Sequence, residues 1–280
     1  MAGSSMKDIK LRIKSVESTM QITKAMQLVA TSKLRRAKER MENSQPYAAV
    51  AGQALEAAIA HCESENVPYV TPRPVKRCCY VVIAGERGLA GGYNSNVFKA
   101  VAADMGDTSC CVLPLGRKAI EKYHHLGVEL LSNAYSRVEG MSVGQCYQLA
   151  KLLTRGYQAG QFDQVKLAYT TFHSMLDQEA RVETLLPLPP MKEGGSSPGA
   201  VYEPSVEEML EQVVPDFLAG KLYSALCDSF ASEVAARRGA MDSATRNAQD
   251  MIGSLTLKYN RARQGAITQE ITEIVAGAEE

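Results

Sequence analysis

The chain has 280 residues and a mass of 30.4 kDa, a size typical of one large domain or two small ones. With 45% hydrophobic and 22% charged residues it can bury a sizeable core, which excludes wholesale disorder. Lys plus Arg and Asp plus Glu both number 31, and this zero net charge argues against a dedicated nucleic-acid-binding protein.

The N-terminal stretch from Ser4 to Gln45 predicts one long helix, because it contains neither Gly nor Pro and is dense in strong helix formers. Its apolar residues alternate steps of three and four, as a coiled-coil seam requires, at Met6, Ile9, Ile13, Val16 and Met20. We expect a register slip after Met20, with the seam continuing at Ile22, Met26, Val29, Leu34, Ala37 and Met41. The sequence Asn43–Pro46 predicts a break or kink, followed by a second helical run that ends this segment at residue 62.

The C-terminal stretch, residues 205–280, has the same character, and no Pro occurs between Asp216 and Ala276. Its predicted seam runs through Met241, Ala244, Ala248, Met251, Leu255, Tyr259, Ala262 and Ala266, and after a slip through Ile267, Ile271 and Ile274. Two long seams at opposite ends of one chain can bury each other if the helices pair antiparallel. The alternative is two separate amphipathic helices packed on a globular body.

The middle of the chain alternates short apolar runs with helical stretches. After a Pro-rich linker at 67–74 we predict strands at 77–84, 109–115, 128–131, 164–172 and 179–186, and helices at 94–105, 117–125 and 142–159. Strands that alternate with helices of this length indicate a mainly parallel sheet. Residues 75–200 are therefore predicted to form an α/β domain inserted between the two halves of a long helical hairpin.

A Gly-rich turn follows the first predicted strand, and it is the best candidate for a nucleotide loop. Its glycines, Gly85, Gly88, Gly91 and Gly92, fit neither the GxGxxG spacing of dinucleotide-binding folds nor a P-loop, which needs a Lys. A structural turn is the favoured interpretation, with a nucleotide-binding α/β protein carrying a coiled-coil arm as the alternative function.

No catalytic centre, cofactor site or metal motif is predicted. The four histidines are scattered, and the seven cysteines show no metal-binding spacing, which favours buried thiols acting as small hydrophobes in a reducing compartment. Charge is unevenly placed, since Lys7 to Arg40 carries ten basic and three acidic residues. This basic stretch is a solvated helix face, a nucleic-acid-binding coiled coil, or a rod that meets acidic rims of a surrounding protein.

Four segments resemble the gamma subunit of F-type ATP synthases: residues 9–37 of the N-terminal helix, 231–248 and 255–277 of the C-terminal helix, and the turn Glu86–Asn96. The resemblance covers nearly the whole chain. It implies a fold in which an antiparallel coiled coil of the N- and C-terminal helices carries an inserted Rossmann-like domain. Plant chloroplast members carry a regulatory dithiol in an inserted segment, whereas the loop from Pro189 to Pro204 has no Cys, so a bacterial-type member fits best.

The resemblance implies a rotor of a proton-translocating ATP synthase, with no catalytic site of its own. Residues 1–62 and 205–280 would form a shaft inside a ring of three alpha and three beta subunits, and residues 75–200 a foot beside the epsilon subunit on the membrane c-ring. Arg263 and Gln264 match a pair that contacts acidic catch loops of beta subunits, and Arg suits carboxylates because its fork can bind them bidentately. Met26 matches a methionine near those loops, and Thr268 and Glu270 match further polar shaft positions.

The sequence contains no apolar run long enough to cross a bilayer, and its first ten residues lack the apolar segment of a secretory signal. The resemblance, together with these two absences, implies a peripheral protein at the cytoplasmic face of a bacterial cell membrane. A processed chain on the matrix side of the mitochondrial membrane is the alternative.

Overall fold

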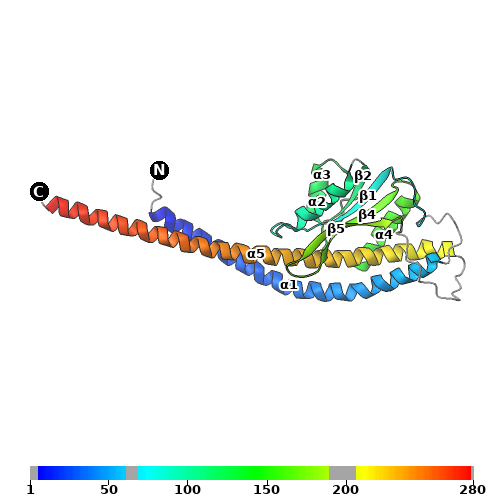
Figure 1. The fold of residues 1–280 in the computed structure, drawn as a ribbon, viewed down its shortest axis with the longest axis horizontal. Coiled ribbons are helices and arrows are strands. Elements are labelled where there is room, and N and C mark those ends of the chain that lie inside the picture. The colour runs from blue at the N-terminus through cyan, green and yellow to red at the C-terminus, as the bar shows by residue number, and fades with distance from the viewer. Residues whose placement is uncertain (1–5, 61–68, 107, 189–205, 279–280) are drawn as a thin grey trace. The chain divides into compact units, whose positions relative to one another are not determined.

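A computed structural model describes residues 6–60, 69–106, 108–188 and 206–278 (Figure 1). The chain divides into two compact units. Residues 1–31 and 238–280 make up one, here the helical unit, and residues 32–237 make up the other, the α/β unit. Helices α1 (Met6–Ala60) and α5 (Val206–Ala278) contribute to both units. No helix in the described ranges has a stretch apolar enough, over sufficient length, to cross a membrane.

The α/β unit contains one five-stranded sheet in the order β3-β2-β1-β4-β5. Its strands are β1 (Arg77–Ile83), β2 (Ser109–Leu115), β3 (Glu129–Leu130), β4 (Gln164–Phe172) and β5 (Gln178–Leu186). Every pair is parallel except β4 and β5, which form an antiparallel edge, so the predicted mainly parallel sheet is confirmed. The remaining helices are α2 (Tyr93–Met105), α3 (Arg117–His125) and α4 (Val143–Gln158).

The two faces of the sheet carry separate cores, because successive side chains of a strand point to opposite faces. On one face Cys78, Tyr80 and Val82 of β1 pack with residues of α2 and α3. On the other, Cys79, Val81 and Ile83 pack with α4 and with α1 and α5. The second core is the larger one, and it includes Leu218, Leu222 and Leu226 of α5 and Leu55 of α1. The long helices are therefore part of the folded α/β unit.

Among the described residues, the cysteines are mostly buried thiols, as the sequence predicted. Cys78, Cys79, Cys111, Cys146 and Cys227 are buried free thiols and Cys110 is partly buried. Burial raises the pKa of Cys146 to about 12, which keeps this thiol protonated. Cys62 and the loop 189–204 lie outside the described residues.

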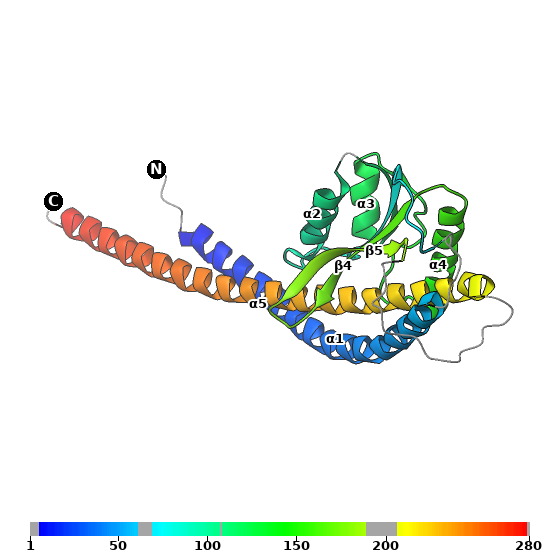
Figure 2. The same ribbon diagram turned by 45° about the vertical axis from the view of Figure 1, so that its right-hand side comes forward.

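Of the break or kink predicted near Pro46, the break is wrong, because α1 continues through this residue to Ala60. Pro46 faces solvent and removes one backbone donor without ending the helix. The second half of α1, drawn in lighter blue, curves as it passes the sheet (Figure 2). Curvature accommodates the proline because the apolar side of the helix, with Leu55, is held in the large core.

In the helical unit α1 and α5 pair antiparallel, but the predicted register slip after Met20 is wrong. The seam keeps its alternating steps through Thr23, Gln27 and Ala30, while Ile22 and Val29 are 60% and 58% exposed. The polar seam residues are satisfied across the pair: the hydroxyls of Thr23 and Thr245 lie 2.8 Å apart, and Gln27 Nε2 donates to Asp242 Oδ1 at 2.8 Å. The slip was predicted because only apolar residues were counted.

The seam of α5 is confirmed over most of its length, with one position displaced by one residue and one residue added. Met241, Ala248, Leu255, Tyr259, Ala262 and Ala266 are buried or half-buried as expected. Ile252 occupies the seam in place of Met251, which is 45% exposed, and the buried Thr245 joins it beside the half-buried Ala244. The corrected seam alternates steps of four and three from residue 241 to residue 266.

The paired hydroxyls of Thr23 and Thr245 provide a stability prediction. Thr23→Val alone should lower the free energy of unfolding by about 1 kcal/mol, because it leaves the buried Thr245 hydroxyl with one partner fewer. The double variant with Thr245→Val should recover most of this loss, since two matched methyl groups then meet. Thermal denaturation followed by circular dichroism measures the two single variants and the double variant. If the double variant loses as much stability as the two single variants together, the pairing is contradicted.

A cluster of charges joins the β4–β5 hairpin to α5. Asp228 of α5 lies near Arg181, His173 and Lys221, which favour its charged form, and near Glu183, which opposes it. Burial is the largest influence and raises the pKa of Asp228 to about 6. The carboxyl group is thus partly protonated in the folded protein at mildly acidic pH.

This raised pKa predicts a pH-dependent effect of Asp228→Asn. A folded pKa above the unfolded value of 3.8 contributes stability below that value, and the contribution is lost as pH rises through about 6. The variant should therefore be more stable than the wild type at pH 8, by about 1–2 kcal/mol, and indistinguishable from it below pH 4. Urea unfolding at both pH values tests this, with the exposed Asp216→Asn on the same helix as control. A difference of the same size at both pH values would contradict the prediction.

Candidate functional site

The five residues proposed to contact partners all lie in the helical unit. Arg263, Gln264, Thr268 and Glu270 are exposed on α5, and Met26 is half-buried on α1. The Thr268 hydroxyl donates to the Gln264 carbonyl at 2.9 Å, so it already has a partner within the helix. Within the described ranges Arg263 makes no ion pair or side-chain hydrogen bond, and its guanidinium is available to a partner.

The antiparallel register places Met26 far from the other four. Because Thr23 meets Thr245 and Gln27 meets Asp242, Met26 lies level with the residue next to Asp242. Arg263 is about twenty residues further along α5, which is roughly 30 Å at 1.5 Å per residue. Met26 and Arg263 therefore lie at different levels of the helical unit.

The last part of α5 has no helical partner among the described residues. In the same register the first residue of α1, Met6, lies level with about Ala262, and α5 continues past this point (Figure 1). The continuing segment carries Ile267, Ile271 and Ile274, which repeat at coiled-coil spacing and are 47%, 56% and 71% exposed. An apolar stripe with this spacing and this exposure is a surface suited to contact another protein.

An open groove of about 750 Å³ lies in the helical unit near the start of α1. Its lining residues are Lys7, Lys10, Leu11, Ile13, Lys14, Glu17 and Tyr259. Three lysines against one glutamate make the groove basic, which suits an acidic partner segment. The basic stretch predicted from the sequence thus coincides here with a hollow surface.

In the α/β unit, the position where doubly wound sheets bind their ligands is filled by α5. Such ligands bind beyond the carboxyl ends of the strands, where the strand order reverses, here between β1 and β4. Thr170 at the end of β4 donates its N–H to Ser229 Oγ of α5 at 3.0 Å and accepts a hydrogen bond from Ser232 Oγ at 3.3 Å. Beyond β1, a Cβ at Gly85 would lie 2.8 Å from Glu233 Oε1. The Glu233 carboxylate would repel phosphate, which disfavours the nucleotide-binding alternative.

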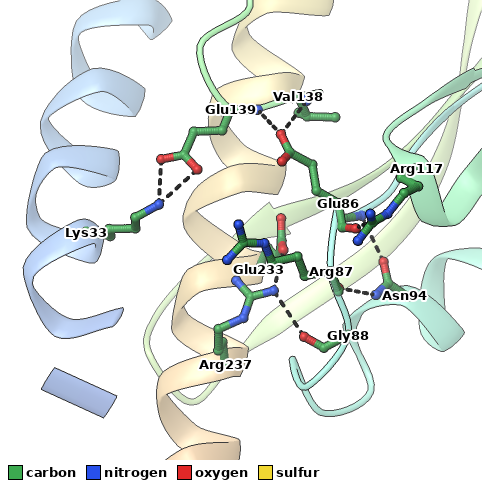
Figure 3. A network of polar contacts seen from close by, with 11 residues as sticks. Lys33, Glu86, Arg87, Gly88, Asn94, Arg117, Val138, Glu139, Glu233 and Arg237 are labelled. Atoms are coloured by element: carbon green, nitrogen blue, oxygen red, sulfur yellow. Dashed lines mark hydrogen bonds and ion pairs between the residues drawn. The ribbon is translucent and has the colours of Figure 1, made fainter. Parts of the chain in front are cut away.

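Glu233 belongs to a polar network around the Gly-rich turn (Figure 3). Arg237 Nη2 of α5 lies 2.6 Å from Glu233 Oε1 and donates to the Gly88 carbonyl at 3.3 Å. Glu86 Oε1 accepts the N–H groups of Val138 and Glu139 at 3.1 and 3.2 Å.

Further bonds fix the turn and reach α1. The Glu139 carboxylate pairs with Lys33 Nζ of α1 at 2.7 Å (Figure 3). Asn94 Oδ1 accepts from the Gly85 N–H at 2.8 Å, and Arg117 Nε donates to the Glu86 carbonyl at 3.0 Å. Both long helices are thereby tied to one turn of the sheet.

Burial raises the pKa of Glu233, and the neighbouring carboxylates of Glu86 and Glu139 add to this effect, while Arg237 opposes it. These residues were not among the sequence candidates. A detectable signal existed, because Glu233 and Arg237 are four residues apart and flank the apolar residues 234–236. Charged residues on a face that is otherwise buried indicate a specific partner.

Comparison with known proteins covers the whole chain. The ATP synthase family profile matches residues 5–280. An ATP synthase gamma chain from Ruminococcus albus is 44% identical over 278 residues, covering 97% of this chain and 96% of the relative. The chain belongs to the ATP synthase gamma chain family. Another gamma chain, from Heliobacterium modesticaldum, is 40% identical and covers 98% of both chains.

A solved structure supports the gamma-chain fold. The mitochondrial ATP synthase rotor of Euglena gracilis matches with a TM-score of 0.68 over 95% of this chain and 100% of that one, at 17% identity. The likeness confirms the fold class, an α/β domain with two long terminal helices, at a distance where few residues are shared.

Proposed function

We propose that this gamma chain is the central-stalk rotor of an F-type ATP synthase, transmitting torque between a membrane c-ring and a catalytic ring. The ring would hold three alpha and three beta subunits around one copy of this chain, and the epsilon subunit would sit beside its α/β unit. The observation that carries the proposal is the antiparallel pair of α1 and α5, in which α5 continues past the level of Met6 and carries an exposed apolar stripe.

The geometry suits this task physically. Two helices joined along a seam resist twisting better than one, and polar pairs such as Thr23 with Thr245 hold their register. The surface is uneven, since a basic groove near Lys10 lies on the helical pair and an apolar stripe near Ile271 lies further along α5. An asymmetric shaft can favour different states at three surrounding sites, because each site meets different contacts.

In this proposal the chain supplies no catalytic residue, and ATP turnover takes place in the surrounding ring. Its support is the carboxylate of Glu233 at the switch point, where a nucleotide phosphate would otherwise bind. The proposed location is the cytoplasmic face of a bacterial cell membrane, held there through partner subunits. The bacterial relatives, at 40–44% identity over nearly the full length, favour this over the mitochondrial alternative.

Co-expression with alpha and beta subunits tests the function. We expect a three-fold ring with one copy of this chain on its axis, visible by single-particle imaging, and ATP hydrolysis that depends on the chain. A chain that stays alone, or that hydrolyses nucleotide without partners, would overturn the proposal. Nucleotide titration of the isolated chain by calorimetry distinguishes the rotor from the alternative, a nucleotide-binding α/β protein, because only the alternative requires binding of ATP or NAD.

Arg263→Ala should weaken assembly or coupling, because its guanidinium is exposed beyond the end of α1 and is proposed to meet acidic loops of beta subunits. We expect about a tenfold loss of chain-dependent turnover, which corresponds to about 1.4 kcal/mol. Arg261→Ala is the matched control, since it removes the same charge from a different side of the helix, two residues away. Equal effects of the two substitutions on ATPase activity would argue against a specific contact.

A further inference from the structure

We propose that the turn formed by residues 85–88 is a clamp that carries torque from the sheet to both long helices. Its positioning residues are Glu233 and Arg237 on α5 and Lys33 on α1. This inference rests on the proposed rotor function, and it assigns a mechanical role to one polar network (Figure 3). None of these residues would touch nucleotide.

On the α5 side, the clamp consists of a buried carboxylate and a guanidinium that bonds to the turn. The Glu233 residue is only 6% exposed, and its carboxylate is held by Arg237 at 2.6 Å. The same guanidinium donates to the Gly88 carbonyl, so one side chain joins helix and turn. Gly85 lets the turn approach closely, because a side chain there would collide with the Glu233 carboxylate.

The α1 side is reached through a second loop. Glu86 holds the backbone of Val138 and Glu139 with two N–H bonds, and the Glu139 carboxylate meets Lys33 of α1 at 2.7 Å. The turn thus bonds to α5 directly, through the Gly88 carbonyl, and is linked to α1 indirectly, through the Glu86 side chain and then Glu139. One displacement of the turn would strain contacts to both helices together.

The polar contacts of the clamp differ in kind from the apolar packing around them. The large core between the sheet and the long helices is apolar, as at Leu218 and Leu222, and a second polar link joins Lys221 of α5 to Glu183 of β5 at 3.4 Å. Apolar contact is non-directional, so it resists separation more than sliding. Hydrogen bonds and ion pairs depend on angle and distance, so a network of them resists rotation of the helices past the sheet. Apart from the serine contacts to Thr170, this turn holds the main polar contacts at the switch point.

The test uses complete ATP synthase with its membrane sector, reconstituted in liposomes, and measures ions pumped per ATP hydrolysed. Arg237→Met should lower this ratio at least two-fold in assembled complexes, because hydrolysis continues while the sheet slips against the helices. Lys33→Glu should lower it as well, by placing two carboxylates together at Glu139. Combining Lys33→Glu with Glu139→Lys should restore the ratio, since the swapped pair re-forms at an exposed site.

Lys118→Met is the matched control, because its ammonium pairs with Glu121 on the same helix and joins no two elements. An unchanged ratio in Arg237→Met, or a loss in Lys33→Glu that the charge swap does not restore, would overturn the clamp. If Arg237→Met fails to fold, the charge-swap series decides alone. Failure of the wild-type chain to assemble would instead refute the rotor function itself, so the two failures are distinguishable.

Discussion

Gly116→Ala should be among the most destabilising single substitutions in the chain, lowering the free energy of unfolding of the α/β unit by about 4 kcal/mol or more. Gly116 links β2 to α3 with φ of 101°, a conformation that L side chains rarely adopt. An added Cβ would lie 2.0 Å from the carbonyl oxygen of Ala84, a backbone atom that cannot move away without disturbing β1. Urea unfolding followed by circular dichroism measures the loss.

Gly127→Ala separates the conformational penalty of a positive φ from the steric clash with the Ala84 carbonyl oxygen. Gly127 also has a positive φ, of 67°, but none of the described atoms lies within 4 Å of its added Cβ. It should therefore cost only the conformational penalty, about 1 kcal/mol. If Gly116→Ala were no more damaging than Gly127→Ala, the close approach of the backbone at Ala84 would not be a real constraint.

Leu222→Ala should cost about 2–5 kcal/mol, because this side chain of α5 is fully buried in the larger core beneath the sheet. The substitution removes apolar contact and leaves a cavity that close-packed neighbours fill only in part. Leu257→Ala makes the same chemical change on the same helix at a side chain that is 63% exposed. This control should change stability by less than about 0.5 kcal/mol in the isolated chain.

The Leu222 result bears on how the chain divides into folding units. Since α5 and α1 contribute Leu218, Leu222 and Leu55 to the core of the sheet, residues 69–188 alone would expose a large apolar face. We expect this excised segment to aggregate or to lack a cooperative thermal transition. A small Leu222→Ala effect, together with a folded excised segment, would show that the α/β domain is independent of the long helices.

Local patterns predicted the secondary structure well. The strand at 109–115, the strand at 164–172 and the helix at 117–125 have the predicted bounds. Alternation of strand and helix was enough to predict the parallel sheet, because a parallel pair needs a long crossover connection. The pairing of the terminal helices followed from two complementary seams in one chain.

The sequence-based predictions were wrong at positions where the outcome depends on a distant residue. Thr23 and Gln27 were passed over as seam residues, since an apolar count does not register that Thr245 and Asp242 lie opposite them. The break at Pro46 was predicted from local chemistry and was overridden by tertiary packing of the helix. In both cases the deciding contact comes from a residue far away in the sequence.

The sequence by itself determined the elements, their order, the α/β class and the family, because helix and strand periodicity and the long motifs are local properties. Only the tertiary structure decided which residues meet. It brought Glu233 and Arg237 of α5 onto a turn some 150 residues earlier, and filled the switch point of the sheet with a helix. It also separated Met26 from Arg263, since antiparallel register, which depends on both helices at once, sets the distance between them.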